Sequence, residues 1–162
     1  MEEFVELLAI AEKLLSKDGC PWDRAQTFAS LRPYFLEEAH EVMEAIDSGE
    51  NHKILEEAGD LLYSIVFLSK IAEKEKKFTI VDILTNIKEK LIRRHPHVFG
   101  TVEAKTPLAV EKNWDAIKTK EKKGSKKISL PLTLPALSKA QKVAQRLKTA
   151  DLLAATAAFE NE

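Results

Sequence analysis

The chain has 162 residues, enough for one domain with a core of its own. It is 44% apolar and 31% charged with a net charge of −1, which excludes the strongly charged surface that attracts nucleic acids or membranes. The lone Cys20 excludes an internal disulfide, no apolar run is long enough to span a membrane, and the acidic start is unlike a signal peptide. We therefore expect a cytoplasmic protein with neither membrane nor nucleic acid as a partner.

The first segment is expected to be an amphipathic helix over residues 2–16, followed by a loop. The apolar side of this helix consists of Phe4, Leu7, Leu8, Ala11, Leu14 and Leu15. Gly19 and Pro21 break the helix, and residues 22–30 are expected to form a loop with at most one helical turn.

Two longer helices follow and are expected to pack as an antiparallel hairpin. They cover about residues 31–47 and residues 51 to about 76, with Asn51 as the N-cap of the second. The polar break between them is short, so the helices must fold back on each other. The second helix is apolar on one stripe and again at Phe67 and Ile71, so most of its circumference should be buried. The stripe consists of Ile54, Leu55, Ala58, Leu61, Leu62, Ile65, Val66 and Ala72.

A fourth helix is predicted to start at Thr79, because Asp82 three residues later completes a capping pair. It should end at His95-Pro96, since the residue before a proline avoids the helical conformation. Its core side is expected to consist of Ile80, Ile83, Leu84, Ile87 and Leu91.

The last third of the chain changes in character. Thr106-Pro107 is a favourable start for a fifth helix that reaches about residue 122. Residues 123–134 read as a linker, and an alanine-rich helix is expected from 136 to about 158. Because prolines interrupt the one apolar run that could form a strand, the predicted class is all-α. The predicted division is a main domain over 1–122, the linker, and a C-terminal helical segment over 135–162.

Four acidic residues on the hairpin form two helical pairs. Glu38 and Glu41 lie one turn apart on the first helix, and Glu57 and Asp60 on the second. Together their charges repel, unless some protonate or a cation binds. Oxygen-only ligands suit a hard divalent ion such as Mg²⁺. Single pairs of this kind also occur on solvated helices, but the apolar surroundings here favour a metal site.

Three cationic side chains, Lys90, Arg93 and Arg94, lie on one broad face of the fourth helix, together with the polar Asn86. Basic residues in a last turn can simply offset the helix dipole. Beside an acidic metal site, however, they favour binding of a polyphosphate. Of the two tryptophans, Trp114 lies near Lys118. A tryptophan in such a polar setting can stack on a base, although a place in the core is more common.

Several local strings resemble one family, the MazG-type nucleoside triphosphate pyrophosphohydrolases. Cys20-Pro21-Trp22-Asp23, followed by Gln26-Thr27, resembles the start of its sequence pattern. The acidic runs at 36–42 and 57–62 resemble its ExxE and ExxD magnesium motifs. Further matching segments follow in order at 90–99, 113–118 and 134–142, so the resemblance covers about residues 4–146.

The resemblance implies an all-α helical bundle that assembles as a homodimer or homotetramer. It implies hydrolysis of nucleoside triphosphates between the α- and β-phosphates, in housecleaning or regulation of the nucleotide pool. Mg²⁺, for which Mn²⁺ can substitute, would be held by Glu38, Glu41, Glu57 and Asp60. Glu37 would activate water, Lys90, Arg93 and Arg94 would contact phosphates, and Trp114 would lie near the base or sugar. The further candidate substrate-binding residues are Trp22, Asn86 and Lys118.

Three other interpretations stay open at this point. A di-iron carboxylate bundle needs two ExxH motifs, and Glu37…His40 has no counterpart on the second helix. A non-catalytic helical interaction module would explain the basic linker at 122–127 but not the clustered acids. A related all-α pyrophosphatase specialised for dUTP or another single nucleotide would share the same motifs.

Overall fold

The computed structural model describes residues 2–121, 130–144 and 147. Within these residues every regular element is a helix, which confirms the all-α class. The chain forms two compact units that divide between Thr101 and Val102. The predicted division near residue 122 stays a prediction, because 122–129 lie outside the described residues.

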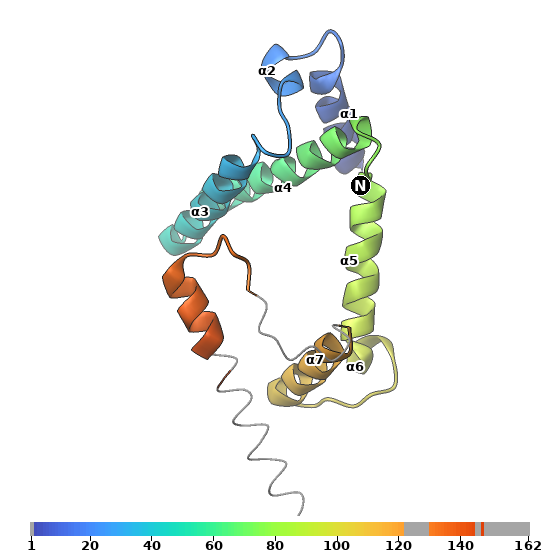
Figure 1. Ribbon diagram of the computed structural model, residues 1–162, viewed down its shortest axis with the longest axis vertical. Helices are drawn as coiled ribbons and strands as arrows, with labels where there is room; N and C mark the ends of the chain where they lie inside the picture. The colour runs from blue at the N-terminus through green and yellow to red at the C-terminus, as the bar shows by residue number, and fades with distance from the viewer. Residues whose placement is uncertain (1, 122–129, 145–146, 148–162) are drawn as a thin grey trace, which may run out of the picture. The chain divides into compact units, whose positions relative to one another are not determined.

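The first unit contains six helices (Figure 1). They are α1 (Glu2–Leu15), α2 (Pro21–Arg24), α3 (Arg32–Ser48), α4 (Asn51–Lys74), α5 (Ile80–Arg94) and α6 (Pro96–Phe99). The second unit contains α7 (Pro107–Glu121) and a helical stretch over 136–144. The predicted helix to 158 is therefore confirmed in its first part, and its remainder lies outside the described residues. None of the helices in the described ranges is long and apolar enough to cross a membrane.

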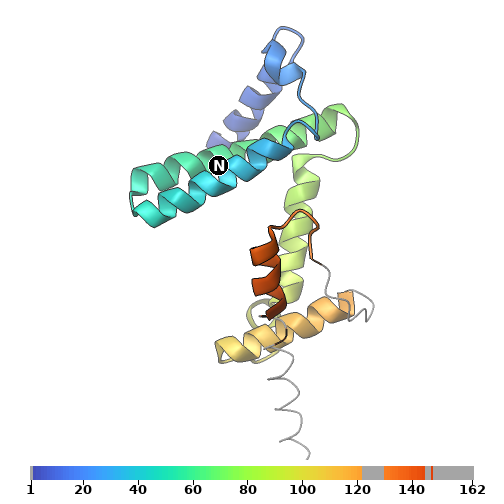
Figure 2. The same ribbon diagram turned by 60° about the vertical axis from the view of Figure 1, so that its left-hand side comes forward.

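Helices α3 and α4 pack side by side as the predicted antiparallel hairpin (Figures 1 and 2). Gly49 closes α3 with a φ of 70°, in the left-handed region that glycine adopts without strain, and its N–H donates to the Ile46 carbonyl at 3.1 Å. The prediction that Asn51 caps α4 was wrong. Glu50 is the N-cap, and its carbonyl accepts from Lys53 and Ile54, because the glycine turn leaves Glu50 in an extended conformation.

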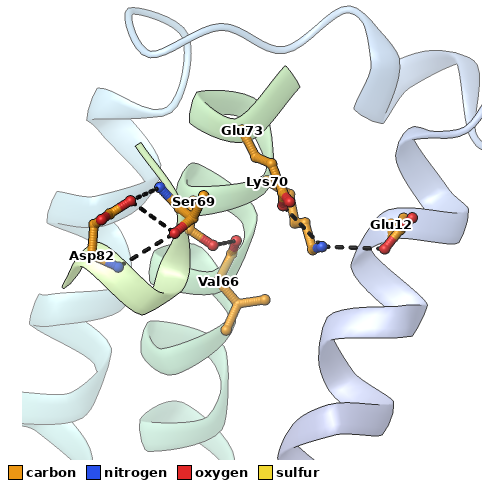
Figure 3. Close-up of polar contacts among 7 residues, drawn as sticks. Glu12, Val66, Ser69, Lys70, Glu73 and Asp82 are labelled. Carbon is orange, nitrogen blue, oxygen red and sulfur yellow. Dashed lines mark hydrogen bonds and ion pairs between the residues drawn. The ribbon is translucent and has the colours of Figure 1, made fainter. Parts of the chain in front are cut away.

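Helix α1 packs against α4 on its predicted apolar side. Ala11 is fully buried, and the other five predicted residues are half-buried. An ion pair also joins these helices. The Lys70 ammonium donates to Glu12 on α1 at 3.2 Å and to Glu73 on α4 at 3.0 Å (Figure 3). Beside it, the buried Ser69 hydroxyl donates to the Val66 carbonyl at 2.6 Å, so it meets the hydrogen-bonding requirement of a buried polar group.

The apolar core lies towards the C-terminal end of α4. Leu31, Phe67 and Ile71 form its centre, and Leu15, Phe28, Tyr34, Phe35, Tyr63 and Leu68 pack around it. The N-terminal half of α4 differs from the prediction, because Leu55 is 78% exposed and Leu62 is 44% exposed. The predicted stripe is therefore buried within this unit only over part of its length.

Helix α5 begins with the predicted capping pair, in which Thr79 and Asp82 exchange hydrogen bonds (Figure 3). The Thr79 backbone N–H and then its hydroxyl lower the pKa of Asp82, because both donate to the carboxylate. The predicted core side of α5 is not a core side here, since Leu84, Ile87 and Leu91 are exposed. The helix ends at Arg94 as predicted, but the short α6 that starts at Pro96 was not predicted.

Two glycines give opposite expectations for stability. A Cβ at Gly19 would overlap the carbonyl oxygens of Leu14 and Lys13, so Gly19→Ala should lower the free energy of unfolding by about 1–3 kcal/mol. A Cβ at Gly59, inside α4, meets nothing within 4 Å, so Gly59→Ala should raise it by about 0.5–1 kcal/mol. Urea unfolding of both variants tests this pair, and a neutral Gly19→Ala would contradict the close approach.

Candidate functional site

The α3–α4 hairpin brings three carboxylates together. Glu38 and Glu41 lie one turn apart on α3, and Glu57 lies on the facing α4. One oxygen of each lies within 4.8 Å of the others, and this trio is called the carboxylate cluster below. The cluster forms because the i, i+3 spacing places the two α3 side chains on one face, and the tight turn at Gly49 aligns α4 beside that face.

Glu38 has the most constrained environment of the cluster. Its Oε2 atom is fully buried and has no hydrogen-bond partner among the described residues. Burial, followed by the charges of Glu41, Asp60, Glu57 and then Glu37, raises the pKa of Glu38 above its usual value of 4.5. The pKa of Glu57 is also raised, first by desolvation and then by the charge of Glu41. The cluster is therefore an uncompensated group of acids at close range.

Asp60 and Glu37 border the cluster without belonging to the compact trio. Asp60 is exposed one turn after Glu57 on α4, and its charge still contributes to the raised pKa of Glu38 and Glu57. Glu37 is exposed on α3, next to Glu38 in the chain. The structure thus groups three of the four predicted ligands closely and keeps the fourth within electrostatic reach.

The donor set of the cluster fits a hard divalent cation. Such an ion prefers carboxylate oxygens and would give the buried Oε2 of Glu38 the partner that it lacks. It would also offset the repulsion among the three carboxylates. The site is therefore compatible with a divalent metal held between α3 and α4.

The predicted cationic face lies on α5. Asn86 and Arg93 are exposed there, whereas Lys90 and Arg94 are half-buried. Helix α5 packs against α4 and α6, and it leads away from the α3–α4 hairpin in both views (Figures 1 and 2). Lys90 lies about 15 Å along α5 from its start, and Glu57 lies about 26 Å before the end of α4. Within one chain, therefore, the cationic face and the carboxylate cluster lie on separate arms.

Trp22 lies on the short α2 and is 55% exposed. It contacts Tyr34 edge-on, with ring centroids 5.8 Å apart and planes at 78°. Tyr34 was not among the residues predicted for this site. Its position four residues before Glu38 was the available signal, since that spacing places both side chains on one face of α3.

The second unit has a hollow of about 480 Å³ beside Trp114. It is lined by Pro107, Val110, Glu111, Trp114, Asp115 and Lys118. The Lys118 ammonium lies 3.4 Å from an oxygen of Asp115 on the same helix, α7. The structure therefore brings the predicted pair Trp114 and Lys118 together at one hollow, and it adds the acidic Glu111 and Asp115, which the sequence analysis did not select.

Known proteins with a similar sequence identify the kind of domain that carries this helical hairpin. Residues 26–99 match the MazG nucleotide pyrophosphohydrolase domain. The nucleoside triphosphate pyrophosphohydrolase/pyrophosphatase MazG of Thermotoga maritima is 48% identical over 145 residues, which are 86% of this chain and 54% of that protein. The nucleoside triphosphate pyrophosphohydrolase of Escherichia coli is 41% identical over 151 residues, 90% of this chain and 57% of that protein.

A solved structure supports the same relationship. The crystal structure of a mazG-related protein from Thermotoga maritima superposes with a TM-score of 0.61 at 27% sequence identity, covering 70% of this chain and 97% of that chain. Fold and site together define an all-helical protein with a carboxylate hairpin compatible with a divalent metal. The chain is similar to proteins of the MazG family over most of its length. It spans about half the length of the two curated relatives described above.

Proposed function

We propose that this protein is a nucleoside triphosphate pyrophosphohydrolase that depends on Mg²⁺. The observation that carries the proposal is the carboxylate cluster, with its buried and unpartnered Glu38 oxygen, inside a MazG domain. Relatives named nucleoside triphosphate pyrophosphohydrolase support the reaction class. The reaction would cleave the bond between the α- and β-phosphates and would serve housecleaning or regulation of the nucleotide pool. Because that pool is cytoplasmic, we place the protein there.

The roles of individual side chains follow from their chemistry. Glu38, Glu41, Glu57 and Asp60 would hold the metal, which when bound supplies charge neutralisation at the phosphates and a more acidic water. Glu37, exposed beside the cluster, would accept the proton of the attacking water.

The remaining candidate residues would bind the substrate. Lys90, Arg93 and Arg94, with Asn86, would hold the phosphates and stabilise the negative charge on the leaving pyrophosphate. Trp22, Trp114 and Lys118 would contact the nucleoside part of the substrate. The mutual alignment of phosphate and water is the main requirement of phosphoryl transfer, so these positioning contacts matter as much as the acids.

Product analysis tests the proposed reaction. With Mg²⁺, the protein should convert nucleoside triphosphates into nucleoside monophosphate and pyrophosphate, and chelation of the metal should stop turnover. A panel of ordinary and damaged triphosphates should include dUTP, so that specialisation for one nucleotide is visible. Release of orthophosphate with nucleoside diphosphate would falsify cleavage at the α–β bond, and lack of turnover with every nucleotide would favour a binding module instead.

We also propose that the working unit is at least a dimer of this chain. Large apolar residues are exposed on each of α3, α4 and α5, and exposed apolar surface that gathers into a patch usually marks an interaction site. They include Leu36, Met43, Ile46, Leu55, Leu62, Leu84, Ile87 and Leu91. A second copy would cover this surface by a symmetric contact. Light scattering at low micromolar concentration should show a dimer or tetramer, and a strictly monomeric and fully active protein would contradict this.

A further inference from the structure

Tyr34 links the carboxylate cluster to the apolar core. It lies four residues before Glu38 on α3, so the two side chains share one face at a separation of roughly 6 Å between their Cβ atoms. Its ring is half-buried and packs against the core formed by Leu31, Phe67 and Ile71. A ring held by the core in this way offers a fixed support directly beside the cluster.

Trp22 packs against the ring of Tyr34. The edge-on contact with Tyr34, at 5.8 Å and 78°, is a preferred geometry for two aromatic rings. The residue nevertheless stays 55% exposed. Exposure of a large apolar ring that is also held in position is typical of a surface on which a ligand stacks.

A second tyrosine places α2 at the same end of the cluster. Because α3 and α4 are antiparallel, Tyr63, which follows Asp60 by three residues, lies at the end of the cluster where Tyr34 lies. Tyr63 is half-buried, and its pKa is raised by desolvation and then by the negative charges of Asp23 and Cys20. The segment from Cys20 to Asp23 is therefore close to both tyrosines, at the end opposite the Gly49 turn.

We propose that Trp22 is the stacking surface for the base of the nucleotide, and that Tyr34 is a positioning residue that holds it there. The substrate then lies in one direction on the hairpin, with its nucleoside towards α2, its α-phosphate at the carboxylate cluster and its terminal phosphates towards the Gly49 turn. This inference rests on the proposed function. It assigns the base to the unit that carries the carboxylates, whereas Trp114 lies in the hollow of the second unit.

The two tryptophans make the proposal measurable by fluorescence. In Trp114→Phe, Trp22 is the remaining indole, and in Trp22→Phe, Trp114 is. A slowly hydrolysed α,β-methylene nucleoside triphosphate with Mg²⁺ should change the emission of Trp22 with a saturable curve. Pyrophosphate with Mg²⁺ should leave that emission unchanged, because it has no base to stack.

Substitutions at Tyr34 separate positioning from folding. Tyr34→Leu should remove the emission change in the Trp114→Phe background and raise KM by about 10-fold with kcat changed by less than about 3-fold, the pattern expected when a binding contact is lost. Tyr34→Phe keeps the ring and should behave like the parent. Phe78→Leu is the matched control, since it removes a ring contact of similar separation, 6.1 Å to Phe28, and should change neither KM nor the emission.

Three results would overturn the inference while leaving the proposed function intact. In the first, the protein turns over nucleotide but the emission of Trp22 does not change on nucleotide binding. In the second, pyrophosphate changes that emission as much as the nucleotide does. In the third, Tyr34→Leu folds and has the same KM and emission change as Tyr34→Phe. If Tyr34→Leu does not fold, the response of Trp22 to nucleotide against pyrophosphate decides the question. Lack of both turnover and nucleotide binding in the parent protein overturns the proposed function and this inference with it.

Discussion

Glu38→Gln should lower turnover by about 10²–10³-fold and, in the absence of metal, raise the thermal midpoint. The substitution keeps the size of the side chain but removes a charged oxygen ligand. A divalent ion at a phosphoryl group contributes several kcal/mol of charge stabilisation, which corresponds to this loss of rate. The metal-free protein should gain stability, because one of the three crowded charges of the cluster is removed.

The pH dependence of stability gives a second readout for the same variant. Burial, and then the neighbouring carboxylates, raise the pKa of Glu38 above 4.5, so the folded chain binds this proton more tightly than the unfolded chain. A raised carboxyl pKa means that the free energy of unfolding falls as the pH rises through 4.5 and upward. In Glu38→Gln, the free energy of unfolding of the metal-free protein should therefore fall less steeply as the pH rises through this range.

Glu44→Gln is the matched control for Glu38→Gln. Glu44 is an exposed glutamate on the same helix and lies outside the carboxylate cluster. It should keep turnover, Mg²⁺ dependence and the pH profile of the parent. Activity near the parent value in Glu38→Gln, or equal effects of the two substitutions, would remove the basis for the metal assignment.

Arg94→Ala and Lys90→Ala should each lower kcat/KM by about 10–100-fold while leaving Mg²⁺ affinity unchanged. A charge-assisted hydrogen bond to a phosphate contributes about 1.5–3 kcal/mol, which sets this range. Lys88→Ala, an exposed lysine on the same helix, is the control and should change little. Steady-state kinetics beside a Mg²⁺ titration gives both quantities, and unchanged kinetics would mean that the two cations only offset the dipole of α5.

Mixing variants tests whether two chains share one site. Since α5 leads away from the hairpin, the cations that serve one carboxylate cluster should come from a second copy (Figures 1 and 2). A dimer of one Glu38→Gln chain and one Arg94→Ala chain would then contain one intact site. Random exchange of the two impaired proteins should therefore raise the activity to about a quarter of the parent value. No recovery after verified exchange would place both sets of residues in one chain.

The sequence predicted the helices and the acidic cluster well because both depend on local signals. The capping pair Thr79–Asp82, the proline at 107 and the short break after Ser48 act over a few residues, and the i, i+3 spacing of Glu38 and Glu41 fixes a common face on any helix. Burial was predicted less well. The apolar spacing that includes Leu55 and Leu62 predicts that this side of the helix is covered. It does not tell whether the same chain or another copy covers it, and within this chain both residues are exposed.

Contacts between distant segments were beyond the sequence analysis for a related reason. The edge-on contact of Trp22 and Tyr34 depends on how the loop before α3 returns to the helix, and no residue spacing encodes this path. The short α6 was also missed, since Pro96 was read as a helix stop although proline is equally suited to a first helical position.

If a second copy covers the exposed apolar side of α5, the folding of this helix depends on the amount of protein in the cell. No residue of this 15-residue helix is buried in the described chain, and an isolated helix of this length is only marginally stable in water. A second copy that covers α5 would bind the folded arm and not the unfolded one, so mass action would make the arm more stable as the protein becomes more abundant. In a cell that makes little of it, the newly made chain would spend longer with this arm open to proteases.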